Sequence, residues 1–171
     1  MYKRQSIVTA ADGFLAEEQR SGYGIPFATT AYPWGSNSDI LNRAMILGLA
    51  ERFTGAARYR NGAVDAMDYV LGRNPLDQSF VSGFGWNPMR NPHHRFWAHQ
   101  LDPKLPGPPP GVLSGGPNST SFADPIAATL KGTCAPQRCW RDDTRAYAVN
   151  EVAINWNAPL LWVATYLDAP R

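Results

Sequence analysis

The stretch SNSDILNRAMILGLAERFTGAARYRNGAVDAMDYVLG, residues 36–72, predicts two consecutive helices. Ser36 and Asp39 have the spacing of a capping box and would open the first helix. Apolar residues then recur with a helical period up to Gly55, which predicts the end of the helix. These residues are Ile40, Leu41, Ala44, Met45, Leu49 and Phe53.

The second helix is expected from about Ala56 to Leu71, with Gly72 as its end. Its apolar stripe consists of Tyr59, Ala63, Met67 and Val70. Because the junction at Thr54 and Gly55 is tight, the two helices would form an antiparallel αα-hairpin. The sequence has no βαβ alternation and no internal repeat, so it predicts an all-α protein of helical hairpins with long loops.

Helices are also expected on both sides of this hairpin. A short one lies around Ile7–Glu18, and Asn157-Ala158-Pro159 looks like a cap with proline in the first turn of a last helix. One face of that last helix would carry Leu160, Leu161, Ala164 and Leu167. Residues 72–118 hold nine prolines and seven glycines and lose the helical period, although Ser79–Gly85 reads as a short strand-like piece. A loop of this length is usually functional.

The composition describes one globular domain. The 171 residues are 44% hydrophobic and 18% charged, and the net charge of +2 is too small to indicate nucleic acid or an anionic membrane as a partner. Six tryptophans favour a stacking surface, although some would fill the core. No apolar run is long enough to cross a membrane. The first residues do not form a signal peptide, so either the protein is cytoplasmic or the chain does not begin where its gene does.

Two cysteines, Cys134 and Cys139, flank four residues. A zinc site needs four ligands, and a single pair at this spacing is weak evidence for one. The spacing favours a local disulfide, which requires an oxidising compartment, and two unpaired thiols are the alternative.

The stretch WRDDTRAYAVNEVAINWN, residues 140–157, concentrates three acids, three asparagines and three aromatic rings. An acid that holds its proton near neutral pH needs partial desolvation or a negative neighbour, and Glu151 has Trp156, Asp142 and Asp143 near it in sequence. Aromatic faces beside carboxylates suit a sugar ring. The stretch therefore indicates carbohydrate chemistry with Glu151 as an acid, and its alternative is a helix start with capping residues.

A second candidate cluster lies in the long loop. His93 and Arg95 are two residues apart, so in an extended loop both side chains point the same way and could bind hydroxyls or a carboxylate. A metal site on His93, His94 and His99 is the competing interpretation, but no acidic ligand accompanies it at compact spacing. The third interpretation is a structural arginine with a capping histidine.

Longer patterns carry a family resemblance. They are YPWGSN at 32–37, YVLGRNPL at 69–76, SFVSGFG at 79–85 with PHHR at 92–95, PGVLSGGPN at 110–118, and W-x-D-x4-Y-x3-E at 140–151. From about residue 22 to residue 167 the chain resembles the C-terminal part of a glycoside hydrolase family 9 catalytic domain, the inverting cellulases.

This resemblance implies a fold that is part of an (α/α)6 barrel, with loops forming one end of an open substrate cleft. It also implies roles for seven residues. Glu151 would be the general acid, Asp142 the second acidic signature residue, His93 the signature histidine, Arg95 a contact to substrate hydroxyls, Tyr147 and Trp156 aromatic signature positions, and Trp34 a sugar-stacking ring. No cofactor is required. Family members commonly bind structural calcium, but no ligand set in this chain matches one.

One departure from the family concerns the general base. The family's base lies in an N-terminal Asp-Ala-Gly-Asp type motif, and the nearest text here, Ala10-Ala11-Asp12-Gly13, lacks the second aspartate. An inverting glycosidase needs an acid and a base. Residues 1–171 are therefore expected to be the C-terminal portion of such a domain, with the base in a missing upstream segment. The isolated chain should be nearly inactive and leave apolar faces uncovered.

The expected activity is hydrolysis of β-1,4-glucosidic bonds in cellulose or related β-glucans with inversion, by a secreted enzyme. The expected partners are the polysaccharide and the missing N-terminal part of the domain. Two alternatives remain: a catalytically inactive carbohydrate-binding fragment that uses the aromatic cleft, and a helical interaction protein.

Overall fold

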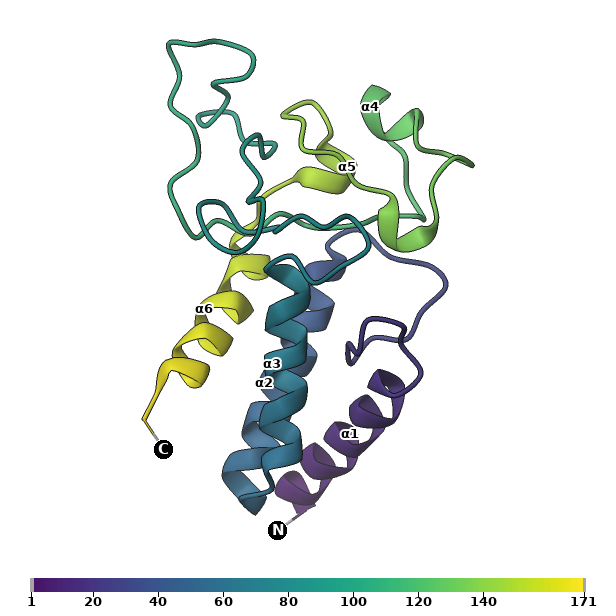
Figure 1. Ribbon diagram of the computed structural model, residues 1–171, viewed down its shortest axis with the longest axis vertical. Helices are drawn as coiled ribbons and strands as arrows, with labels where there is room; N and C mark the ends of the chain where they lie inside the picture. The colour runs from purple at the N-terminus through teal and green to yellow at the C-terminus, as the bar shows by residue number, and fades with distance from the viewer. Residues whose placement is uncertain (1, 171) are drawn as a thin grey trace.

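The computed structural model describes residues 2–170, and Figure 1 shows a fan of long helices beneath a layer of loops. The long helices are α1 (Tyr2–Glu18), α2 (Ser36–Thr54), α3 (Ala57–Val70) and α6 (Ile154–Asp168). The loop layer contains α4 (Pro125–Ala128), a 3₁₀ turn at Pro136–Arg138 and α5 (Tyr147–Asn150). Within residues 2–170 extended backbone pairs only as isolated bridges, which confirms the all-α class.

Helix α2 is the centre of the fan, because it contacts α1, α3 and α6. Its residues Ile40, Leu41 and Ala44 are fully buried, as their period predicts. Phe53, by contrast, is 38% exposed and lies under the guanidinium of Arg4. Helix α6 approaches α2 at Gly48, where a Cβ would lie 3.0 Å from the Trp162 ring. The contact of α2 with α6 therefore depends on a glycine that lies outside the predicted apolar period.

Helix α2 ends where the sequence predicts, but its start is capped differently. Gly55, with a φ of 69°, ends α2, and its N–H donates to the carbonyl of Glu51. The N-cap is Gly35 and not Ser36, so the predicted capping box is wrong. The Ser36 hydroxyl is buried and donates to the carbonyl of Pro117 at 2.7 Å. The Ser36 side chain, which local rules assign to the helix cap, therefore forms a tertiary hydrogen bond to the loop layer.

The outer helices are longer than predicted. Helix α1 begins at Tyr2 and α6 at Ile154, so Pro159 lies inside α6 and Asn157 does not cap it. The Asn157 side chain instead accepts from the N–H of Leu113 at 2.8 Å and donates to two carbonyls. This amide fixes the loop layer on the first turns of α6.

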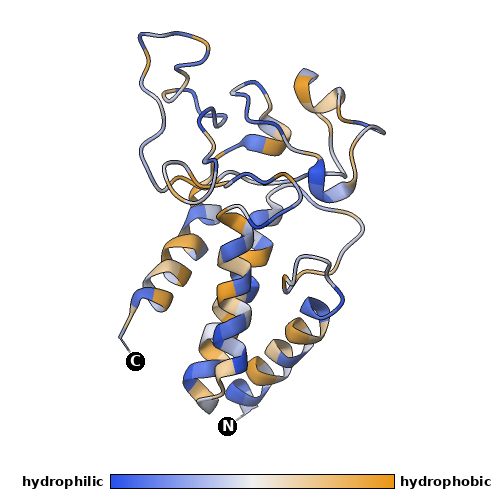
Figure 2. Cartoon of the chain, viewed as in Figure 1, coloured by the Kyte–Doolittle hydropathy of each residue, from blue (hydrophilic) through white to orange (hydrophobic). Residues whose placement is uncertain are grey.

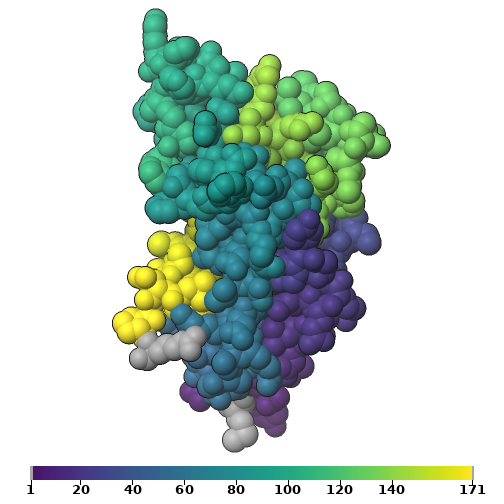
Figure 3. Space-filling model, viewed as in Figure 1, coloured from purple at the N-terminus to yellow at the C-terminus, as the bar shows by residue number. Residues whose placement is uncertain are grey.

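Helix α6 buries only part of the predicted face. Pro159, Leu160, Val163 and Tyr166 are the buried residues, whereas Leu161 is 70% exposed and Ala164 is also exposed. The predicted face lines a largely apolar groove of about 980 Å³ together with α3 and the loop residue Phe84. Figure 2 shows the apolar residues of α6, and Figure 3 shows this helix, in yellow, at the flank of the molecule. The structure thus has the uncovered apolar face expected of a partial barrel.

The loop layer packs on the same hydrophobic core as the helices. Phe80 is fully buried and packs edge-on against Trp140 with ring centroids 5.3 Å apart. Its backbone N–H donates to the carbonyl of Val70, and its carbonyl accepts from Ser114, so the predicted strand-like piece forms bridges without a strand. In the part of the chain that the structure describes, no helix is long and apolar enough to span a bilayer.

Candidate active site

Glu151 lies where three distant segments of the loop layer meet. It follows α5 directly and forms an isolated parallel bridge with His93. The His93 N–H donates to the carbonyl of Asn150 at 2.8 Å, and the Gly115 N–H donates to the carbonyl of Glu151 at 2.8 Å. The backbone of the predicted acid is therefore held from both sides.

The Glu151 side chain is half-buried and meets a tryptophan from the opposite end of the sequence. Trp34 donates its indole N–H to Oε2 of Glu151 at 3.1 Å. The Trp34 ring is 38% exposed and stacks on Tyr147 with centroids 6.0 Å apart and an angle of 28°. A carboxyl group beside two aromatic faces is the arrangement that suits a sugar ring.

His93 contributes an acceptor to the same place. Its Nδ1 lies 2.6 Å from the carbonyl of Thr144, so Nδ1 carries the hydrogen and Nε2 of the neutral ring has a free lone pair. The ring lies 5.6 Å from that of Tyr147, measured between centroids. The structure therefore brings four of the predicted residues together: Glu151, Trp34, Tyr147 and His93.

Asp142 holds the loop that carries His93. Its two oxygens accept the backbone N–H groups of Arg90 and Asn91 at 2.8 and 2.7 Å. Burial raises the pKa of Asp142, and these two hydrogen bonds act in the opposite direction. Asn150 reinforces the same connection by donating to the carbonyl of Asn91 at 2.7 Å. Asp142 thus acts on the site through backbone geometry.

The Asp143 carboxylate is paired with an arginine. It accepts two hydrogen bonds from the Arg145 guanidinium, at 2.9 and 2.6 Å, which hold the pKa of the Asp143 carboxyl below its ordinary value. The two aspartates that precede Glu151 in sequence therefore serve in a loop tether and an ion pair.

Trp156 and Arg95 lie apart from the carboxyl contacts. A Cβ on Gly35 or Gly115 would come within 2.7 or 2.8 Å of the Trp156 ring, so this ring supports the backbone on both sides of the site. Arg95 is exposed, and its guanidinium has no hydrogen-bond or ion-pair partner within residues 2–170. It is thus free to meet a ligand.

The other histidines have separate contacts. His94 stacks on Trp97 with centroids 4.0 Å apart, and His99 pairs through Nδ1 with the carbonyl of Leu105. Over the described residues no three His, Cys, Asp or Glu side chains are grouped so that they could hold a metal ion.

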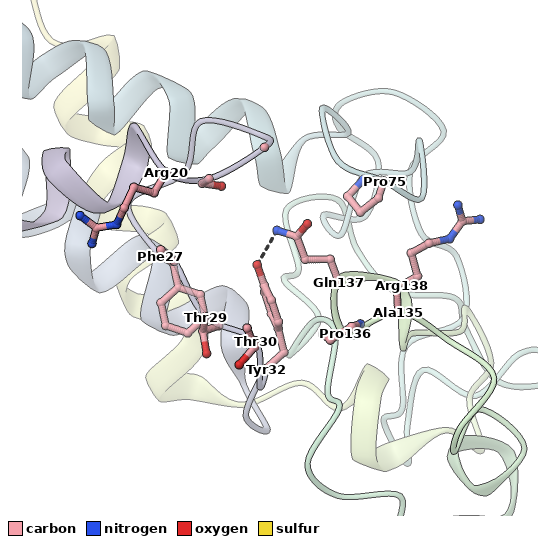
Figure 4. Close-up of a pocket in the computed structure, with 13 residues that line it drawn as sticks. Arg20, Phe27, Thr29, Thr30, Tyr32, Pro75, Ala135, Pro136, Gln137 and Arg138 are labelled. Carbon is pink, nitrogen blue, oxygen red and sulfur yellow. Dashed lines mark hydrogen bonds between the residues drawn. The ribbon is translucent and has the colours of Figure 1, made fainter.

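A second hollow, of about 730 Å³, lies between residues 20–32 and residues 135–138 (Figure 4). Gln137 donates to the hydroxyl of Tyr32 there, and burial raises the pKa of Tyr32 to about 12. The Cys134–Cys139 disulfide, with Cα atoms 5.3 Å apart, fixes the turn that carries Gln137. Of the predicted site residues none lines this hollow, so it is separate from the carboxyl site.

The residues that set the geometry of the site were not predicted from the sequence. Thr144 orients the His93 ring, and Asn150 connects the loop at Asn91 to α5. Gly35 leaves space for the Trp156 ring. Their partners lie 51 to 59 residues away for Thr144 and Asn150, so no local pattern could identify them.

Solved structures with the same fold define the class of protein as helical-barrel glycoside hydrolases. A glycoside hydrolase family 9 endoglucanase named J30 superimposes with a TM-score of 0.87 and 32% identity, over 98% of this chain and 31% of that one. The AaCel9A structure in complex with cellobiose-like isofagomine matches with a TM-score of 0.83 and 36% identity, over 97% of this chain and 31% of that one.

Curated sequences agree. A cellulose 1,4-beta-cellobiosidase of Acetivibrio thermocellus is 48% identical over 96% of this chain, and endoglucanase C of Cellulomonas fimi is 40% identical over 96%. The pattern of glycosyl hydrolase family 9 matches residues 3–164, and the chain belongs to this family. It spans 19% and 15% of the length of those two relatives.

Proposed function

We propose that this chain supplies the acid side of an active site that hydrolyses β-1,4-glucosidic bonds in cellulose or related β-glucans. The observation that carries the proposal is the Glu151 carboxyl beside Trp34, Tyr147 and His93, in a chain whose family relatives are cellulases.

In this mechanism Glu151 protonates the glycosidic oxygen as the bond to the sugar breaks. A second carboxylate takes a proton from water on the opposite face of the sugar, and the anomeric configuration inverts. The free Nε2 of His93 accepts a hydrogen bond from a sugar hydroxyl, and the exposed Arg95 donates to others. Trp34 and Tyr147 present their rings to the faces of the sugar.

The general base comes from outside residues 1–171. Asp142 uses both oxygens on backbone N–H groups, and Asp143 is paired with Arg145, which leaves neither well placed to activate a water. The chain spans about a third of the solved family 9 structures. The proposed unit is therefore the C-terminal portion of a catalytic domain whose remainder carries the base.

The groove between α3 and α6 is the proposed docking surface for that remainder. Ile154 and Leu161 are 92% and 70% exposed, and Phe84 beside them is 56% exposed. Such a face is costly to leave in water and is covered in a closed helical barrel. This chain spans 31% of a solved family 9 structure, and we propose that the remaining part of such a domain supplies the helices that cover the groove. Sedimentation of the chain alone tests whether the remainder of the domain is what covers the groove. A stable dimer that Leu161→Lys abolishes would show that a second copy of the chain covers it instead.

Extracellular action follows from the substrate, because cellulose is an insoluble polymer outside the cell. The Cys134–Cys139 disulfide supports this localisation, since such bonds persist in oxidising compartments.

Glu151→Gln tests the acid role in a joined protein, in which the N-terminal part of the catalytic domain of the 48% identical relative precedes this chain. Loss of a general acid should lower turnover of cello-oligosaccharides by roughly 10²- to 10⁴-fold, while their affinity stays unchanged. Binding without turnover in the unsubstituted joined protein would instead indicate a carbohydrate-binding fragment.

A further inference from the structure

The hydrogen bond between Trp34 and Glu151 joins residues 117 positions apart. An indole has one N–H and no acceptor, so it can only donate. It meets one oxygen of the carboxyl, Oε2, at 3.1 Å. Because the ring also stacks on Tyr147, its N–H edge and its face have different neighbours.

Trp34 is held rigidly. Gly35, which follows it, has a φ of 83°, a left-handed conformation that residues with a side chain rarely adopt. A Cβ at Gly35 would collide with Trp156 at 2.7 Å, and the next residue, Ser36, is tied to Pro117. The indole therefore approaches the site from a fixed turn at the start of α2.

Glu151 is held equally well. Its carbonyl accepts from Gly115, and its backbone is bridged to His93. With both backbones fixed, the 3.1 Å contact selects one carboxyl oxygen over the other. A donor that points at Oε2 favours the state in which Oε2 is an acceptor and the other oxygen, Oε1, carries the acidic proton.

We propose that Trp34 is a positioning residue for the general acid, in addition to any stacking on sugar. It places the proton of Glu151 on Oε1. During the reaction the bond between the anomeric carbon and the glycosidic oxygen breaks, the oxygen keeps the bonding pair and takes the Oε1 proton, and Glu151 becomes a carboxylate. The Trp34 N–H then donates to a charged oxygen, and such bonds are about twice as strong as neutral ones. The inference rests on the proposed acid role of Glu151.

The first test needs no catalysis and uses the full 171-residue chain. Trp34→Phe identifies the indole N–H signal of Trp34 in a ¹⁵N spectrum, and this signal is then followed against pH. We expect it to shift with a single titration, and we expect Glu151→Gln to abolish the titration. Trp86 is the control, because its ring is 68% exposed and its signal should not respond to Glu151→Gln. A Trp34 signal that ignores Glu151→Gln would overturn the proposal.

The second test separates positioning from stacking in the joined protein. Trp34→Phe keeps a ring and removes the N–H. We expect kcat on cello-oligosaccharides to fall roughly 10- to 100-fold, part of the full effect of a general acid, with KM changed less than about twofold. A dinitrophenyl cellobioside, whose leaving group needs no proton, should lose less than about threefold on the same reasoning.

An equal loss on both substrates with a raised KM would mean that Trp34 only stacks on sugar, and the proposal would fail. Trp86→Phe should leave both rates unchanged. If Glu151→Gln has no effect on turnover, the proposed function fails, whereas the indole titration still decides whether Trp34 positions this carboxyl.

Discussion

The helix fan and the loop layer are stabilised by different forces. In the fan, α2 buries aliphatic residues such as Ile40, Leu41 and Leu47 against its three neighbours. In the loop layer, buried polar side chains bind backbone groups far away in sequence, as Asp124, Asn118 and Ser82 do. Hydrogen bonds between distant segments can make a site built on loops rigid, and Glu151 lies in this layer.

The largest effect should come from the centre of the fan. Leu47→Ala removes a fully buried side chain and should lower the free energy of unfolding by about 3 kcal/mol. Leu161→Ala is the matched control, because Leu161 is 70% exposed and should cost under about 0.5 kcal/mol in this chain alone. Urea denaturation measures both. A similar cost at the two positions would mean that the α6 face is already covered.

Asp124→Ala tests the loop layer. The Asp124 side chain is 1% exposed and accepts the N–H groups of Ala127 at 2.6 Å and Ala148 at 2.7 Å, so it connects α4 to α5. Two buried donors left without partners should cost about 3 kcal/mol or slightly less. Asp102→Ala removes one exposed bond, to Lys104, and should be nearly neutral. Equal effects in urea denaturation would contradict the contrast between buried and exposed bonds.

Gly35→Ala acts at the boundary of the two regions. The left-handed backbone and the approach of Trp156 to 2.7 Å should together cost about 2 kcal/mol. Gly13→Ala is the control, since a Cβ there meets nothing within 4 Å in α1. Thermal unfolding compares the two variants, and an unchanged Tm for Gly35→Ala would show that the turn before α2 is not constrained.

Glu18 acts on stability through pH, and solvent reduces its effect because this side chain is only partly buried. Burial, with the nearby charge of Asp65 as a lesser cause, raises the pKa of Glu18 from 4.5 to about 7. The folded chain therefore binds a proton that the unfolded chain has lost, and stability should fall as pH rises from 4.5 through 7. Glu18→Gln should flatten this decline in a series of urea denaturations. A variant that keeps the full pH dependence would rule out Glu18 as its source.

The sequence predicted the fan better than the loop layer. Apolar period and glycine stops located α2 and α3 because these are local signals. Ser36 and Asn157 look like caps by the same local rules, but each is used in a tertiary bond to the loop layer. The exposed side of α6 looks like a core face because it is apolar, and in this chain its covering is absent.

In the loop layer no period exists, and the contacts join residues far apart. The grouping of His93 and Glu151 followed from family resemblance, and the bridge between them is present. The Trp34 hydrogen bond spans 117 residues, and no spacing rule reaches that far. The close contact of two glycines with the Trp156 ring likewise could not be predicted from the sequence.

We propose that residues 1–171 contain the acid of the site and depend on the remainder of the domain for the base. Reducing-sugar release from a soluble β-glucan, measured for this chain alone and for the joined protein, tests it most directly. We predict no release by the chain alone and Glu151-dependent release by the joined protein. Glu151-dependent release by the chain alone would contradict it, because a base would then lie within these residues.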